Sequence, residues 1–135
     1  MSRLMFALLF AVAAPAFAAN LTVNVDGVSN ADGQIMIAVF NSADTFPVKP
    51  VRALAVPAQS GKVQLVVPDL PAGDYALAVY HDANGNGKLD RNLVGMPIED
   101  YAFSNNAMGK RGAPGFDDAR IALPAGGATV SVNLR

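Results

Sequence analysis

The chain has 135 residues, no cysteine, one histidine and a formal net charge of −1. A near-neutral charge with no basic run excludes a nucleic-acid binder that works by electrostatics. The absence of cysteine and the single histidine exclude thiol catalysis and multi-histidine zinc sites. The length fits one domain.

The first residues have the pattern of a secretory signal peptide. Arg3 supplies the positive charge, residues 4–14 form an apolar run, and Ala16, Phe17 and Ala18 match the small-residue cleavage rule. We therefore predict a signal peptide over residues 1–18, a mature domain over 19–135, and a periplasmic or secreted location. The apolar run is shorter than the roughly 20 residues of a spanning helix, so no membrane span is expected after cleavage. Losing Arg3 leaves nine Lys and Arg against eleven Asp and Glu, a net charge of −2.

The mature part contains strand patterns separated by turn residues. Leu21, Val23 and Val25 alternate with polar residues, and Tyr75, Leu77 and Val79 alternate with alanines. Seven strands are predicted in this way, over residues 21–25, 35–40, 54–56, 63–67, 75–79, 121–123 and 130–134.

Seven short strands with frequent turns are typical of an all-β fold. We predict a single antiparallel β-sandwich of about seven strands, immunoglobulin-like or transthyretin-like, with an open barrel as the alternative. The cysteine and tryptophan landmarks of immunoglobulin domains are absent, so strand number alone supports that label.

Residues 82–90 follow the spacing of a calcium-binding loop, D-x-[DN]-x-[DN]-G. Calcium prefers six to eight oxygen ligands, and a glycine at the sixth position, here Gly87, allows the sharp turn that points alternate side chains inward. The predicted metal ligands are Asp82, Asn84, Asn86, the backbone carbonyl of Lys88, and Asp90.

This loop departs from the calcium pattern in two respects. Position 12, which usually carries a bidentate Glu, is Leu93, and only Asp82 and Asp90 bring charge, so weak binding is expected. Glu99 or Asp100 could fold back as a missing ligand. The alternative is an Asn- and Gly-rich turn that binds no ion. In either case Asp82 and Asp90 are expected to lie in a loop outside the core.

Residues 91–118 are predicted to form a long irregular loop, and loops of that length are usually functional or disordered. Its apolar residues argue against disorder. They either pack over one end of the sandwich or belong to a surface for an unidentified protein or small ligand. The residues proposed for that surface are Glu99, Tyr101, Phe103, Ser104, Asn105 and Asn106.

Several blocks of the sequence together resemble one bacterial family. They are Asp74-Tyr75-Ala76, the run from His81 to Asp90, the run from Gly95 to Ala107, and Gly112-x-Pro114-x-Phe116. This succession is similar to the family called domain of unknown function 2141. The resemblance implies an exported β-sandwich domain of Gram-negative bacteria and carries no established activity.

Three functions are compatible with these observations. The first is an exported, calcium-stabilised binding or accessory module with no catalytic activity, in which the ion orders the long loop. The second is an ion-free structural or interaction domain. The third is a small hydrolase using His81 with carboxylates, or with Ser104 as nucleophile, although no nucleophile-elbow motif is present. The sequence does not specify an oligomeric state.

Overall fold

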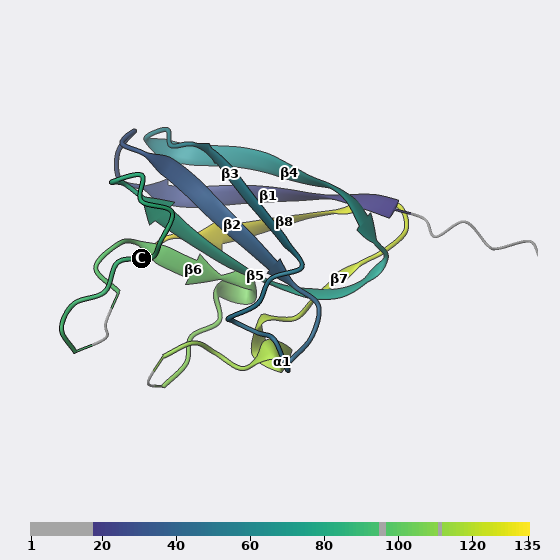
Figure 1. Ribbon diagram of the computed structural model, residues 1–135. Coiled ribbons are helices and arrows are strands. Elements are labelled where there is room, and N and C mark those ends of the chain that lie inside the picture. Colours follow the sequence, from purple (N-terminus) through teal and green to yellow (C-terminus); the bar gives the residue numbers. More distant parts are fainter. Residues whose placement is uncertain (1–17, 95–96, 111) are drawn as a thin grey trace, which may run out of the picture.

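The computed structural model describes residues 18–94, 97–110 and 112–135 (Figure 1). Apart from Ala18, the predicted signal peptide lies outside the described residues. The elements in chain order are β1 (Ala18–Val28), β2 (Gln34–Phe40), β3 (Arg52–Pro57), β4 (Gly61–Pro71), β5 (Gly73–Asp82), β6 (Tyr101–Phe103), the 3-10 turn η1 (Ser104–Asn106), α1 (Phe116–Ala119), β7 (Ile121–Leu123) and β8 (Ala128–Asn133).

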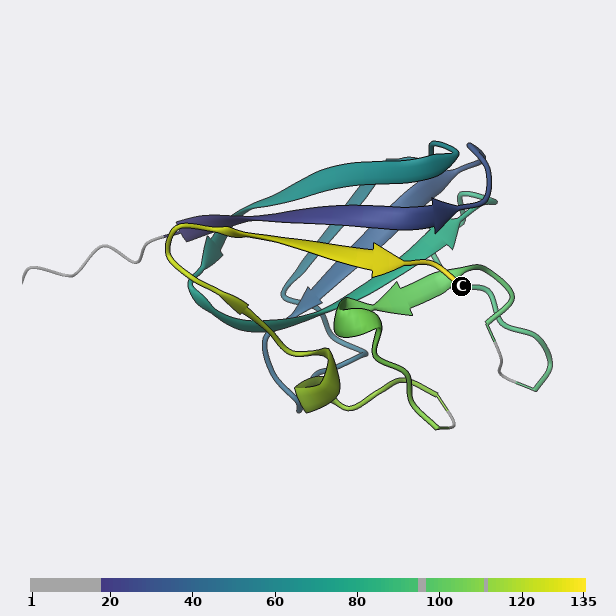
Figure 2. The ribbon, with the colours of Figure 1, turned by 180° about the vertical axis from the view of Figure 1, so that it is seen from behind.

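The strands form two sheets that face each other. One has the order β4-β1-β8, and Figure 2 shows it in front of the other. The second has the order β3-β2-β5-β6, and β7 pairs with the beginning of β5. The sheets do not close into a barrel.

The core lies between the inner faces of the sheets, where period-2 alternation places the large apolar side chains. Leu21, Val23 and Val25 of β1 have no exposed surface, and neither does Leu77 of β5. Alternate residues of β4 are likewise buried. Burial of each such side chain stabilises the fold by about 1.5–3 kcal/mol. This shared apolar layer therefore holds the two sheets together without disulfides.

The all-β prediction is confirmed, with three differences in detail. The described residues form eight strands where about seven were expected. The expectation of an antiparallel sandwich is wrong at β1 and β8, which pair in parallel. The segment 91–118 is not irregular throughout, because it contains β6, η1 and α1. β6, η1 and α1 have only three or four residues each and lie within an Asn-, Gly- and Pro-rich segment, so the sequence did not separate them from the loop around them.

A second apolar cluster, formed by aromatic rings, ties the later loops to the sheet. Phe46 lies at its centre, with ring centroids 5.1 Å from Phe40, 5.8 Å from Phe103 and 6.0 Å from Phe116, all in edge-to-face geometry. Such pairs contribute about 0.5–1.5 kcal/mol beyond the burial of their surface. The cluster thereby fixes β6 and α1 on the five-stranded sheet.

Within residues 18–94, 97–110 and 112–135, no helix has the length and apolar character needed to cross a membrane.

Candidate functional site

The predicted calcium loop begins at the last residue of β5, and that residue is buried. Asp82 is 0% exposed, so the expectation that it lies outside the core is wrong. Its Oδ2 accepts hydrogen bonds from Gly87 N at 2.7 Å and from Gln34 Nε2 at 3.3 Å, and its Oδ1 accepts one from Asn86 N at 3.2 Å. Three N–H donors compensate the buried carboxylate, which therefore organises the loop from inside.

The other predicted ligands meet at Asp90. Asn84 Nδ2 donates to Asp90 Oδ2 at 2.5 Å, and Asn86 Nδ2 donates to Asp90 Oδ1 at 2.7 Å. The oxygen of Asn84 accepts from Asn86 N at 3.2 Å, and that of Asn86 accepts from Lys88 N at 2.9 Å. The fold thus brings the side chains of loop positions 3, 5 and 9 into direct contact.

Glu99 folds back onto this loop, as the sequence suggested. Its Oε2 accepts from Ala83 N at 3.0 Å and its Oε1 accepts from Asp90 N at 2.9 Å. One carboxylate therefore bridges the two ends of the loop. Asp100 instead accepts a hydrogen bond from Ser29 Oγ at 2.7 Å, away from the predicted ligands.

Asp90 also joins the loop to the segment that follows it. Its carbonyl accepts a hydrogen bond from Ile98 N at 2.9 Å, and Arg91 forms an isolated antiparallel bridge with Pro97. The described residues that follow Asp90, up to Val94, project from the sheets in both views, as do residues 107–110 after η1 (Figures 1 and 2). Asp90 is consequently the base of a projecting loop as well as a candidate ligand.

Two residues around the loop were missed by the sequence analysis. Gln34 reaches Asp82 because β2 pairs with β5, a register that single-strand patterns do not specify. Tyr80, two residues before Asp82 on β5, donates its hydroxyl to the carbonyl of Gly87 at 3.1 Å. Burial raises the pKa of Tyr80, and the negative charges of Asp82 and Glu99 raise that pKa further.

His81 points to the opposite side of β5 from this carboxylate network. Its ring Nε2 donates to the carbonyl of Asp32 at 2.6 Å, and the residue is 3% exposed. Ser104 contacts β5 four residues away, at Leu77, a separation of about 13 Å along a strand. A direct contact between the Ser104 hydroxyl and the His81 ring is therefore not formed.

Ser104 is completely buried. Its hydroxyl accepts from Leu77 N at 2.9 Å and donates to the carbonyl of Ala119 through a short hydrogen bond. It thereby links β5, η1 and α1. The hydroxyl uses both its donor and an acceptor position within the fold.

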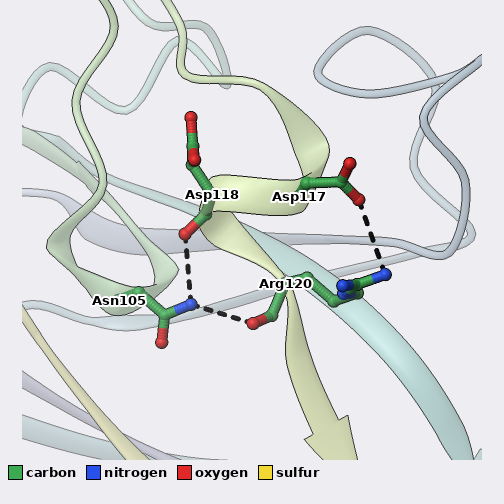
Figure 3. A network of polar contacts seen from close by, with 4 residues as sticks. All are labelled: Asn105, Asp117, Asp118 and Arg120. Atoms are coloured by element: carbon green, nitrogen blue, oxygen red, sulfur yellow. Dashed lines mark hydrogen bonds and ion pairs between the residues drawn. The ribbon is translucent and has the colours of Figure 1, made fainter.

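The two asparagines after Ser104 also bind backbone. Asn105 Nδ2 donates to the carbonyls of Asp118 at 3.2 Å and Arg120 at 2.9 Å, at the end of α1, while Arg120 pairs with Asp117 at 3.5 Å (Figure 3). Asn106 accepts from Asn133 N at 2.9 Å, which attaches η1 to β8. Both asparagines have positive φ, 61° and 50°, a conformation that Asn tolerates better than most residues.

Tyr101 and Phe103 complete the set proposed for ligand or partner binding. Their ring centroids lie 6.0 Å apart, and with Asn106 they line a hollow of about 30 Å³. That volume holds one or two water molecules. Small-molecule sites are usually ten times larger or more.

The charged groups of the described residues do not form a ready metal centre. In the part of the chain that the structure describes, no group of three or more His, Asp and Glu residues is arranged to hold an ion. A cation at 82–90 would therefore depend on amide and carbonyl oxygens beside the carboxylates. Lys88 joins the loop through its backbone N–H, which donates to Asn86 Oδ1 at 2.9 Å, and ligation through its carbonyl stays a prediction.

The projecting loop after Asp90 carries exposed apolar side chains. Leu93 is 107% exposed, Val94 81% and Ile98 65%. Met108, on the loop after η1, is 62% exposed. Several of the apolar side chains of segment 91–118 are therefore exposed, whereas Phe103 and Phe116 pack against Phe46.

Comparisons with known proteins identify the family but no characterised relative. A search of curated proteins and a search of solved structures each found no match. One family model, described as "Uncharacterized protein conserved in bacteria (DUF2141)", matches residues 23–131, from β1 into β8, including the whole candidate site. The chain belongs to this family, which confirms the resemblance noted in the sequence.

Proposed function

We propose that the protein is an exported, calcium-stabilised β-sandwich module with no catalytic activity, which presents the loop after Asp90 to a partner. The observation that carries this proposal is the position of Asp90. Its carboxylate contacts both loop asparagines, and its backbone binds Glu99 and Ile98. An ion bound in the loop would act directly on the base of the projecting segment.

The oxygens of the loop retain capacity for a cation. A carboxylate has about four lone-pair positions and an amide oxygen has two. Asp90 uses two positions for Asn84 and Asn86, and each asparagine oxygen uses one for a backbone N–H. A calcium ion would displace the two amide donors from Asp90 and bind the remaining acceptor position of each asparagine oxygen.

The same contacts argue for weak binding. The two amide groups already compensate the charge of Asp90, and the three donors on Asp82 compensate the second carboxylate. Calcium must compete with these bonds, so a Kd of roughly 0.1–1 mM is expected, as in weak extracellular calcium modules.

Calcium is expected to raise the melting temperature of the mature protein. At about 10 mM calcium, mass action at this affinity stabilises the native state by about 1.4–2.7 kcal/mol, which is several degrees for a domain of this size. Scanning calorimetry of chelator-stripped protein measures the shift. Magnesium is expected to have a smaller effect because it requires a tighter octahedron.

Asp90→Ala should abolish this shift, and Asp44→Ala is the matched control. Asp44 is exposed and lies in the loop between β2 and β3, so its removal changes the charge equally without touching the site. Asp82→Ala is a poor probe, because Asp82 is buried and organises the loop without an ion. An equal calcium response in Asp90→Ala and wild type would contradict the proposal.

Tyr80 offers a second readout that does not depend on stability. Because burial and then the charges of Asp82 and Glu99 raise its pKa, a calcium ion beside these carboxylates should lower it. Ultraviolet titration of the phenols with calcium and with chelator measures the change. Tyr80→Phe should remove the calcium-sensitive component, while the titration of Tyr75, whose pKa is raised by burial and lowered by Arg52, should not respond.

The apolar residues of the projecting loop support the assignment of a binding role. Leu93 and Val94 are adjacent, almost fully exposed, and within four residues of Asp90. Exposed apolar groups that cluster on a soluble protein usually mark an interaction surface. The hollow beside Tyr101 and Phe103 is too small for most metabolites, which argues against a small ligand bound between these two side chains.

An ion-free interaction domain is the second candidate, and a specific observation favours it. Among the described residues, no buried side-chain nitrogen or oxygen lacks a hydrogen-bond partner, so the loop needs no ion to compensate it. In this case the projecting loop would have the same role, and the melting temperature would not respond to calcium.

Export is part of this proposal and has its own test. β1 begins at Ala18, and Ala19 is buried and pairs with Leu70, so cleavage after Ala18 would leave almost the whole strand in place. We expect intact-mass analysis of protein isolated from the periplasm to give a chain that starts at Ala19. A mass corresponding to residues 1–135 would contradict export with cleavage.

A further inference from the structure

The candidate loop contains two consecutive Asn-Gly pairs. Asn84-Gly85 and Asn86-Gly87 are separated by no other residue, and all four residues are exposed. Asn-Gly is the sequence most prone to deamidation, because glycine has no side chain to hinder its own nitrogen from attacking the preceding amide.

The reaction needs no enzyme. The glycine backbone nitrogen, after losing its proton to water, attacks Cγ of the asparagine side chain, and ammonia leaves as a cyclic succinimide forms. Water then opens the ring at one of its two carbonyls and yields aspartate or isoaspartate. The net change is the gain of water and the loss of ammonia, so a neutral amide becomes a carboxylate.

The structure distinguishes the two glycine nitrogens. Gly87 N donates to the buried carboxylate of Asp82 at 2.7 Å, whereas Gly85 N donates to the neutral carbonyl of Asp82 at 3.3 Å. Gly87 N must give up this charge-assisted hydrogen bond before it can attack Asn86 Cγ, and the adjacent negative charge opposes loss of its proton. Gly85 N has only the longer bond to a neutral acceptor.

From this difference we infer that Asn84 is a site of spontaneous deamidation, that Asn86 is protected, and that conversion of Asn84 to aspartate strengthens the calcium site. The statement about the calcium site rests on the proposed function. Asn84 Nδ2 lies 2.5 Å from Asp90 Oδ2, so conversion replaces a donor to Asp90 with a second carboxylate. Two carboxylates at contact distance repel each other until a cation lies between them.

The modification is tested on the wild-type protein alone. Folded protein is aged at mildly alkaline pH in chelator, and peptide mass spectrometry with electron-based fragmentation measures aspartate and isoaspartate at each position. We expect Asn84 to convert about tenfold faster than Asn86 or more, because Gly87 must first give up a charge-assisted bond. In concentrated urea, where that bond is lost, the two rates should become equal.

Equal rates in the folded protein, or faster conversion of Asn86, would overturn the assignment of Asn84. Asn84→Gln gives the control, since the longer side chain closes a six-membered ring far more slowly. It should abolish conversion at position 84 and leave the slow conversion of Asn86 unchanged.

The effect on calcium is tested with Asn84→Asp, which reproduces the aspartate product. In chelator this variant should melt below wild type, and in calcium it should show about tenfold tighter binding, because ligand charge sets affinity in such loops. Calcium binding no tighter than in the wild type would overturn the statement that aspartate at position 84 strengthens the calcium site. A wild-type protein indifferent to calcium, together with selective conversion of Asn84, would instead refute the proposed function and leave the modification site in place.

Discussion

Replacing Gly33 with alanine is expected to lower the free energy of unfolding by about 2–5 kcal/mol. Gly33 ends the turn before β2 with φ of 64°, and an added Cβ would lie 2.0 Å from the carbonyl oxygen of Asp82 and 2.8 Å from the carbonyl group of Ala83. Left-handed backbone costs an ordinary residue about 1–2 kcal/mol, and overpacking adds about 1–3 kcal/mol. Because the obstacle is backbone, no side chain can move aside to relieve it.

Gly85→Ala separates these two contributions. Gly85 has a φ of 69°, close to that of Gly33, but a Cβ at this position meets nothing within 4 Å. It should therefore cost only the backbone term, about 1–2 kcal/mol. Chemical denaturation of both variants measures their free energies of unfolding. Equal decreases in the two variants would show that a Cβ at position 33 does not clash with the backbone at the end of β5.

Ser104→Ala is expected to destabilise the protein by about 2–4 kcal/mol, although it removes a single oxygen. The substitution leaves the N–H of Leu77 and the carbonyl of Ala119 without their partner in a site that has no exposed surface. A buried polar group that loses its partner costs about 1–3 kcal/mol, and here two groups are affected. Equilibrium urea unfolding gives the measurement.

Ser131→Ala is the matched control for this substitution. Ser131 is exposed on β8, and surface substitutions of this kind usually change stability by no more than about 0.5 kcal/mol. A stability change in Ser104→Ala as small as in the control would mean that the hydroxyl has no structural role.

The strands could be predicted because their sequences repeat with the period of the structure. Leu21, Val23 and Val25 face the core in β1, and their alternation with polar residues in the sequence predicts this buried face. β6 could not be found in this way, since its three residues lie inside a long Asn-, Gly- and Pro-rich segment and the strand is defined by its partners on β5. The parallel pairing of β8 with β1 is equally absent from local sequence, because it depends on which strands meet in space.

The candidate site was predicted in part for the same reason. Asn84, Asn86 and Asp90 lie close together in the sequence, and the fold brings their side chains into contact. The burial of Asp82 and its bond from Gln34 required knowledge of the register between β2 and β5. Ser104 and Asn105 were predicted to belong to a ligand or partner surface, and only the packing of η1 against α1 reveals the backbone groups that they bind.

The pairing of β1 with β8 determines when the domain can finish folding. Leu21 lies opposite Ala128, so the three-stranded sheet joins the first strand to the last across most of the chain. Contacts of such high sequence separation form slowly, because closing the long intervening loop costs conformational entropy before the contact stabilises the fold. A polypeptide still emerging from the ribosome lacks β8 and cannot complete this sheet. For an exported protein, as proposed above, this topology would help the chain to stay unfolded until it has passed through a secretion channel.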